Sequence, residues 1–139
     1  MSPITELAWL DRYVGSPHKT NGRGPAGYDC WGLMLAVWRE QRGIELPDWQ
    51  APNDASFVAA VEAVGKFYKE FPTAGPAVQV EEGRDWDFVA VIRRRAALHM
   101  GLLIGGGVLH SSYPQGAVWD PEPRFNQHHP YREYWRWLG

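Results

Sequence analysis

The sequence predicts an α+β fold in which helices come first and an antiparallel sheet follows. Apolar residues recur at three- and four-residue steps before residue 77, whereas later apolar segments are short, β-branched and separated by glycine or proline. Helices that precede strands, rather than alternating with them, favour antiparallel pairing. With 139 residues, 45% of them hydrophobic, the chain is expected to form one domain over residues 1–139.

Three helices are predicted before the strands. They cover residues 4–10, which follow Ser2–Pro3 and end before Gly15, residues 30–42, and residues 52–72. Asp29 is a suitable N-cap for the second helix, and Gly43 is a suitable residue for its end. The segment 15–27 is rich in glycine and proline, and we expect a loop that leads to Asp29.

Five strands are predicted in the second half of the chain. They cover residues 77–81, 87–94, 99–105, 108–113 and 117–120. The glycines at 105–107 separate two of these strands and indicate a hairpin.

Bulk properties exclude several function classes. The formal net charge of −2 argues against nucleic-acid binding by overall charge, and no glycine-rich strand-to-helix motif indicates a nucleotide site. A single cysteine cannot form an internal disulfide. We expect synthesis in the cytoplasm without a signal peptide, and no run approaches the roughly 20 apolar residues of a membrane span. The arginines at 93–95 are expected in a solvated turn, with contact to an anionic polymer as the less favoured reading.

Cys30, in the first turn of a predicted helix, is a candidate nucleophile. The helix dipole and unpaired amides at such a position favour the thiolate, so we expect a thiol more acidic than a free one. The alternative is an inert, buried cysteine, which is common for a lone thiol.

His99 and His110 are candidate partners for the thiol. If Gly105 and Gly106 form a two-residue turn, the two histidines are diagonal neighbours on one face, with Cβ atoms roughly 7–8 Å apart. A three-residue turn without a bulge would place them on opposite faces, and the alternative is two ordinary strand histidines. His128 and His129 are expected to be solvated. The sequence has no HxxxH pair and no second cysteine, so the indication of a zinc site is weak.

Two blocks of the sequence resemble the NlpC/P60 peptidases, in the form found in bacteriophage tails and gene-transfer-agent tails. The first block is GSPHKTNGRGPAGYDCWGLMLAVWREQRGIELPDW, and the second is HMGLLIGGGVLHSS. The ending YREYWRW resembles the basic, aromatic ending of that family. The likeness covers nearly the whole chain and is least clear around residues 50–85.

The resemblance implies a papain-like fold with N-terminal helices packed on an antiparallel sheet. It implies Cys30 as nucleophile, His99 as general base and His110 as the residue that orients His99. It further implies cleavage of peptidoglycan stem peptides, commonly between γ-D-Glu and a diamino acid, with no metal or organic cofactor. The resemblance also implies that the protein is carried in a phage-like tail to the cell wall or periplasm.

The sequence departs from the family pattern at three places. His18 stands after Pro17 where many members have a tyrosine that shapes the oxyanion site, and Tyr28 is a conceivable substitute. Trp31 replaces a serine that helps to hold the amine of the substrate. Asp29, Tyr28, His18 and Trp31 are therefore the candidate substrate or oxyanion residues. The usual GD before a strand is Trp86–Asp87.

Two other functions remain open from the sequence. One is a structural plug or hub of a tail with little activity, and the other is an amidase or acyltransferase acting on a lipid or other small amide. The expected partners are other tail proteins, contacted through apolar patches supplied by some of the eight tryptophans. The terminal segment 134–137 (YWRW) is the best candidate, although it can instead close the protein's own sheet.

Overall fold

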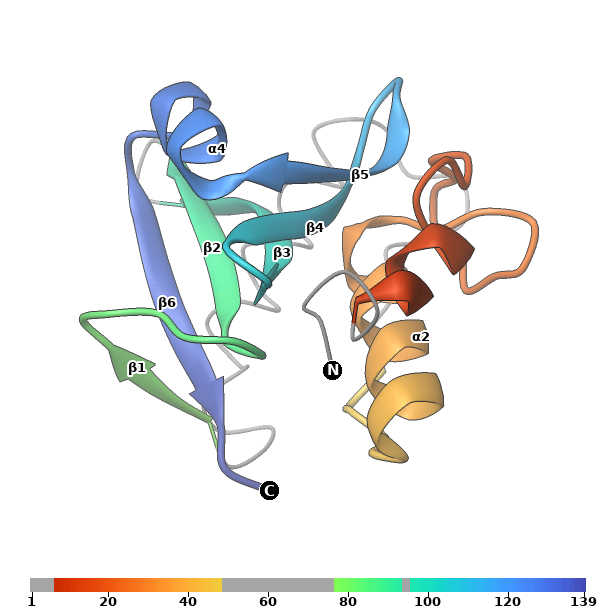
Figure 1. Ribbon diagram of the computed structural model, residues 1–139, viewed down its shortest axis with the longest axis horizontal. Coiled ribbons are helices and arrows are strands. Elements are labelled where there is room, and N and C mark those ends of the chain that lie inside the picture. The colour runs from red at the N-terminus through yellow and green to blue at the C-terminus, as the bar shows by residue number, and fades with distance from the viewer. Residues whose placement is uncertain (1–6, 49–76, 94–95) are drawn as a thin grey trace.

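The computed structural model describes residues 7–48, 77–93 and 96–139. The predicted helix 52–72 lies outside these residues, as do residues 4–6 of the predicted helix 4–10. The first described element is a short 3₁₀ helix, η1 (Ala8–Arg12). Figure 1 shows the N-terminal segments and one long helix on one side of a twisted sheet.

The sheet has six strands in the order β1-β6-β2-β3-β4-β5, and neighbouring strands pair antiparallel. The predicted α+β class with an antiparallel sheet is confirmed. The strands are β1 (Ala77–Val80), β2 (Phe88–Arg93), β3 (Ala96–Ile104), β4 (Gly107–Ser112), β5 (Gly116–Pro121) and β6 (Arg132–Trp137).

The long helix α2 (Cys30–Arg42) begins and ends where local chemistry predicts. The Asp29 side chain accepts a hydrogen bond from the Gly32 amide at 2.6 Å, and Gly43 adopts a left-handed conformation with φ of 67°. Eight consecutive residues from Trp31 to Trp38 are buried, because the helix packs on β3 and β4 and shares their core with side chains of the N-terminal segment. Phe88, Leu102 and Leu109 are among the sheet residues in this core.

The opposite face of the sheet is covered by a short helix that the sequence analysis did not predict, α4 (Glu122–His128). Its Phe125 packs with Val89, Leu103 and Val108 in a second apolar cluster. Two prolines near the start of the segment obscured its helical pattern, although proline is tolerated in the first helical turn.

Of the two turn lengths that the sequence left open for the β3–β4 hairpin, the structure has the two-residue turn. Ile104 pairs with Gly107, so the loop consists of Gly105 and Gly106, both with positive φ. Two residues of positive φ match the type I′ turn that suits the twist of a hairpin. This turn fixes the register that the histidine hypothesis requires.

The C-terminal aromatic segment belongs to the protein's own sheet. Strand β6 lies between β1 and β2, and Trp135 is buried. The alternative that this segment closes the protein's own sheet is confirmed, because both edges of β6 are paired with neighbouring strands.

The tryptophans in the described part of the chain lie in the core or pack against it. Trp86 stacks on Trp9 and meets Trp38 edge to face, and Trp38 stacks on Phe88. The large hydrophobic side chains that are exposed in the described part of the chain are Val14, Val78, Tyr113, Tyr131 and Leu138. The expected tryptophan docking patch is therefore not found there. Among the described helices, none has the length and apolarity to cross a membrane.

Candidate active site

The helix start that carries Cys30 is held by a loop that folds back on it. The Arg23 guanidinium donates to the Asp29 carboxylate at 2.9 Å and to Asp48 at 3.0 Å. A Cβ at position 32 would collide with the carbonyl oxygen of Gly22, so Gly32 allows the loop to approach. The N-cap, its guanidinium partner and the glycine together fix the position of the thiol.

The Cys30 thiol lies against the strand that carries His99. Its sulfur accepts hydrogen bonds from the backbone amides of Met100 and Trp31. The neighbouring Tyr28 carbonyl accepts a hydrogen bond from Ser111 of β4 at 2.8 Å, which ties the helix start to the second strand of the hairpin.

Burial, together with the nearby Asp29 carboxylate, raises the pKa of the Cys30 thiol to about 11. The two amide hydrogen bonds and Arg23 lower it, but desolvation is the largest cause. The expectation of an acidified thiol is therefore wrong for this resting state. Withdrawal from water outweighs the favourable field of the helix start.

The two predicted histidines form one hydrogen-bonded pair, and a carboxylate lies behind them. His99 Nε2 and His110 Nδ1 are 2.8 Å apart, which confirms that the rings point to each other. His110 Nε2 is 2.8 Å from Oδ2 of Asp120 on β5. The sequence analysis missed Asp120. Because His110 pairs with Val118 across the strands, Asp120 is its diagonal neighbour, which a β4–β5 register would have revealed.

Both imidazoles are held neutral. Burial, together with the nearby His110, His129 and His18, lowers the pKa of His99 to about 3. Burial also lowers the pKa of His110, although its bond to Asp120 opposes this. A neutral imidazole is the form that can accept a proton.

His129 is part of this cluster, contrary to the expectation that it is solvated. Its ring packs on Phe125 at 4.6 Å and lies 6.4 Å from both His99 and His110. The Arg132 guanidinium donates to its carbonyl oxygen at 2.6 Å. His128 is exposed, as expected.

His18 also lies near the site. Burial lowers the pKa of His18, while the Asp29 carboxylate raises it. The charge of His18 in turn helps to lower the pKa of His99. Its ring meets the exposed ring of Tyr113 edge to face at 5.7 Å. Of the candidate substrate residues, Asp29 caps the helix start that carries the thiol, and His18 interacts electrostatically with both Asp29 and His99.

Trp31 and Tyr28 are placed differently from expectation. Trp31 is 3% exposed, its indole donates to the Pro47 carbonyl at 2.9 Å, and its ring packs on Phe88. The Tyr28 ring is buried against Tyr13. Neither side chain is available to a substrate in this arrangement, because both fill the core.

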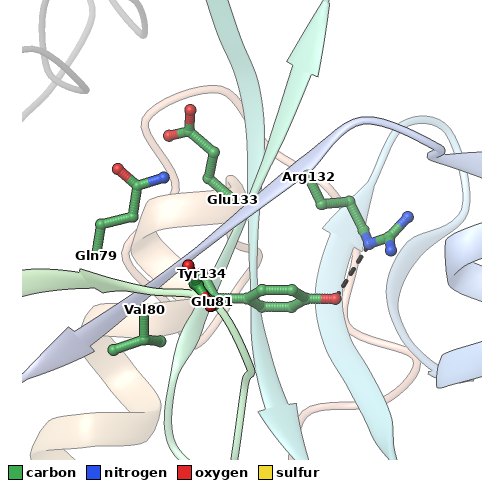
Figure 2. Close-up of a pocket in the computed structure, with 6 residues that line it drawn as sticks. All are labelled: Gln79, Val80, Glu81, Arg132, Glu133 and Tyr134. Atoms are coloured by element: carbon green, nitrogen blue, oxygen red, sulfur yellow. Dashed lines mark hydrogen bonds between the residues drawn. The ribbon is translucent and has the colours of Figure 1, made fainter.

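A separate surface hollow of about 500 Å³ lies between β1 and β6. Figure 2 shows its six lining residues, with the Arg132 guanidinium donating to the Tyr134 hydroxyl at 3.2 Å. It contains no thiol or imidazole and is distinct from the Cys30 site. Across the described ranges, no cluster of three or more histidine, cysteine or carboxylate side chains could hold a metal ion.

Comparisons with known proteins show the fold and the family of the chain. Protein P54 of Enterococcus faecium is 22% identical over 104 residues, which are 74% of this chain and 17% of P54. The chain thus spans a small part of that relative. The NlpC/p60 domain of the peptidoglycan hydrolase SagA shares the fold, with a TM-score of 0.59, 17% identity and 97% coverage of both chains.

A second solved structure is that of a lipoprotein-like NLP/P60 family protein from Staphylococcus aureus. It has a TM-score of 0.54 and 22% identity, and it covers 91% of this chain and 38% of that one. The sequence profile of the NlpC/P60 family matches residues 15–136, which include the thiol, both paired histidines and Asp120. The chain therefore belongs to the NlpC/P60 family.

Proposed function

We propose that this protein is a cysteine hydrolase that cleaves amide bonds in the stem peptides of peptidoglycan. The observation that carries the proposal is the thiol at a helix start, bonded to the strand of a neutral, hydrogen-bonded histidine pair. A nucleophile, a base and a group that orients the base are the parts that acyl transfer requires.

In the proposed reaction, Cys30 and His99 begin as a neutral thiol and a neutral imidazole. As the sulfur attacks the scissile carbonyl carbon, the thiol proton passes to His99. The backbone amide of Cys30 has no intrahelical acceptor, and it donates to the developing oxyanion with His18 as a second candidate donor. The raised pKa of the thiol makes this a coupled proton transfer rather than attack by a preformed thiolate.

The protonated His99 then gives its proton to the leaving amine, and a thioester on Cys30 remains. His99 next takes a proton from a water molecule, which attacks the thioester carbonyl. The second tetrahedral intermediate collapses, the carbon–sulfur bond breaks, and the protonated His99 returns its proton to the sulfur as the acid product is released. His110 holds the His99 ring in both steps.

Peptidoglycan as the substrate is supported by family membership and by the SagA domain, a peptidoglycan hydrolase. We further propose the bond between γ-D-Glu and a diamino acid, supported by the likeness of the two sequence blocks to peptidases of that specificity. The buried Trp31 offers no polar group in place of the family serine, so amine recognition falls to Asp29 and His18.

We also propose that the protein acts as a single domain carried in a phage-like tail to the cell wall or periplasm. This rests on the likeness of the Cys30 segment to tail-associated members. Because both edges of β6 are paired within the sheet, we expect tail proteins to contact the domain without adding a strand beside β6. Immunoblotting of purified particles would test this, and detection only outside particles would contradict it.

The activity is tested by incubating purified peptidoglycan separately with the wild-type protein, with Cys30→Ser and with the control His128→Gln. The released fragments are then identified by mass spectrometry. His128 is exposed on α4. We expect fragments with new γ-D-Glu ends from the wild type and the control, and none from Cys30→Ser. Equal fragment yields from Cys30→Ser and the wild type would contradict the proposal, as would no fragments from any of the three.

A further inference from the structure

A carboxylate ends the chain of hydrogen bonds that begins beside the thiol. Asp120 Oδ2 is 2.8 Å from His110 Nε2, and His110 Nδ1 is 2.8 Å from His99 Nε2. Each histidine therefore uses a defined nitrogen for each partner. The order of donors and acceptors along this chain decides where the protons are.

The carboxylate determines the direction of the chain. An ionised carboxylate only accepts hydrogen bonds, so His110 must carry its proton on Nε2. In neutral His110 the Nδ1 atom is then an acceptor, and His99 must donate to it from Nε2. The remaining ring nitrogen of neutral His99, Nδ1, holds a lone pair and no proton. It is therefore the nitrogen of His99 that can act as a base.

Without the carboxylate, the opposite arrangement would satisfy the same His99–His110 contact. His110 would carry its proton on Nδ1 and donate to Nε2 of His99. His99 would then carry its proton on Nδ1, and its basic nitrogen would be occupied by the neighbouring ring. The two arrangements differ by one tautomer in each ring, and only the group at His110 Nε2 distinguishes them.

The surroundings hold both rings in this geometry. The Phe125 ring meets His110 edge to face at 5.0 Å, and His110 is 3% exposed. The titratable or charged groups that face the relay are His129 after α4, Arg124 on α4 and His18 in the N-terminal loop. Arg124 is mainly exposed and lies 3.9 Å from the other oxygen of Asp120, so it balances the charge only weakly.

We propose that Asp120 is a positioning residue that fixes the tautomers of His110 and His99, so that Nδ1 of His99 is the base. Asp120 acts through the two rings and does not touch the thiol. Its effect on turnover rests on the proposed hydrolase function, whereas the tautomer assignment stands on the hydrogen-bond geometry alone.

Long-range ¹H–¹⁵N correlation spectra of ¹⁵N-histidine-labelled protein near pH 7 test the assignment directly. In the wild type, we expect both His99 and His110 to carry the proton on Nε2, with Nδ1 unprotonated. A wild-type spectrum with the His99 proton on Nδ1, or with a charged His110, would overturn the proposal without any variant.

The variant Asp120→Asn keeps the size of the side chain but can either accept from or donate to His110. We expect mixed tautomers at both rings and a fall in kcat of about 10- to 100-fold with KM nearly unchanged, as for other residues that orient functional histidines. Glu122→Gln removes a nearby carboxylate outside the relay and should change neither quantity. Unchanged tautomers in Asp120→Asn would contradict the proposal.

The two readouts separate this inference from the proposed function. If the wild type has the expected tautomers but does not cleave peptidoglycan, the hydrolase function fails and the tautomer assignment stands. If the wild type cleaves peptidoglycan but Asp120→Asn retains both tautomers and full kcat, the role of Asp120 fails and the hydrolase function stands.

Discussion

The burial of His99 should make the folded protein sensitive to mild acid. In the folded state, desolvation lowers the pKa of His99 to about 3 from the ordinary value of 6.5 for histidine. When the pH falls below 6.5, the unfolded chain binds a proton at this histidine and the folded protein does not. A proton that binds the unfolded chain but not the folded protein favours unfolding. The contribution of neutral His99 to the free energy of unfolding is therefore lost as the pH falls from 6.5 toward 3.

The size of the loss between pH 7 and pH 5 follows from the same two values. A pH of 5 is about 1.5 units below the pKa of the imidazole in the unfolded chain. Each unit corresponds to about 1.4 kcal/mol. The free energy of unfolding should therefore fall by about 2 kcal/mol from His99 alone. Other histidines and carboxylates add their own pH dependence, so the effect must be measured as a difference between two proteins.

Urea unfolding at pH 7 and pH 5 measures this difference. His99→Gln cannot titrate, and its free energy of unfolding should fall by about 2 kcal/mol less than that of the wild type over this interval. His128→Gln, which changes an exposed ring, should behave as the wild type. Equal losses for the wild type and His99→Gln would refute the argument that His99 is buried in the neutral form.

Three other predictions concern the same framework. The rate of Cys30 alkylation should rise with pH toward a midpoint near 11, and a midpoint below 9 would restore the acidified thiol. Asp29→Ala should lower the free energy of unfolding by about 1 kcal/mol in urea titrations, and Asp29→Asn by less, since asparagine also caps helices. Arg136→Met should lower the urea midpoint far more than Arg124→Met, because the 2%-exposed Asp87 carboxylate would lose both of its guanidinium bonds. Similar midpoints for those two variants would contradict this.

Local chemistry determined much of the site from the sequence. Asp29 caps α2, and Gly105 and Gly106 form the hairpin turn, because capping and turn conformations depend on a few adjacent residues. Once the turn has two residues, the alternation of side chains along a strand brings His99 and His110 together. The roles of these residues in catalysis remain predictions.

Tertiary structure alone decided the features that depend on distant segments. Asp120 joins His110 only through the register of β4 and β5 across a three-residue loop, and β6 enters the sheet between strands from far earlier in the chain. The protonation of Cys30 and His99 could not be predicted from their positions in the chain. A pKa depends on how much water the surrounding core excludes, and that core is assembled from both halves of the sequence.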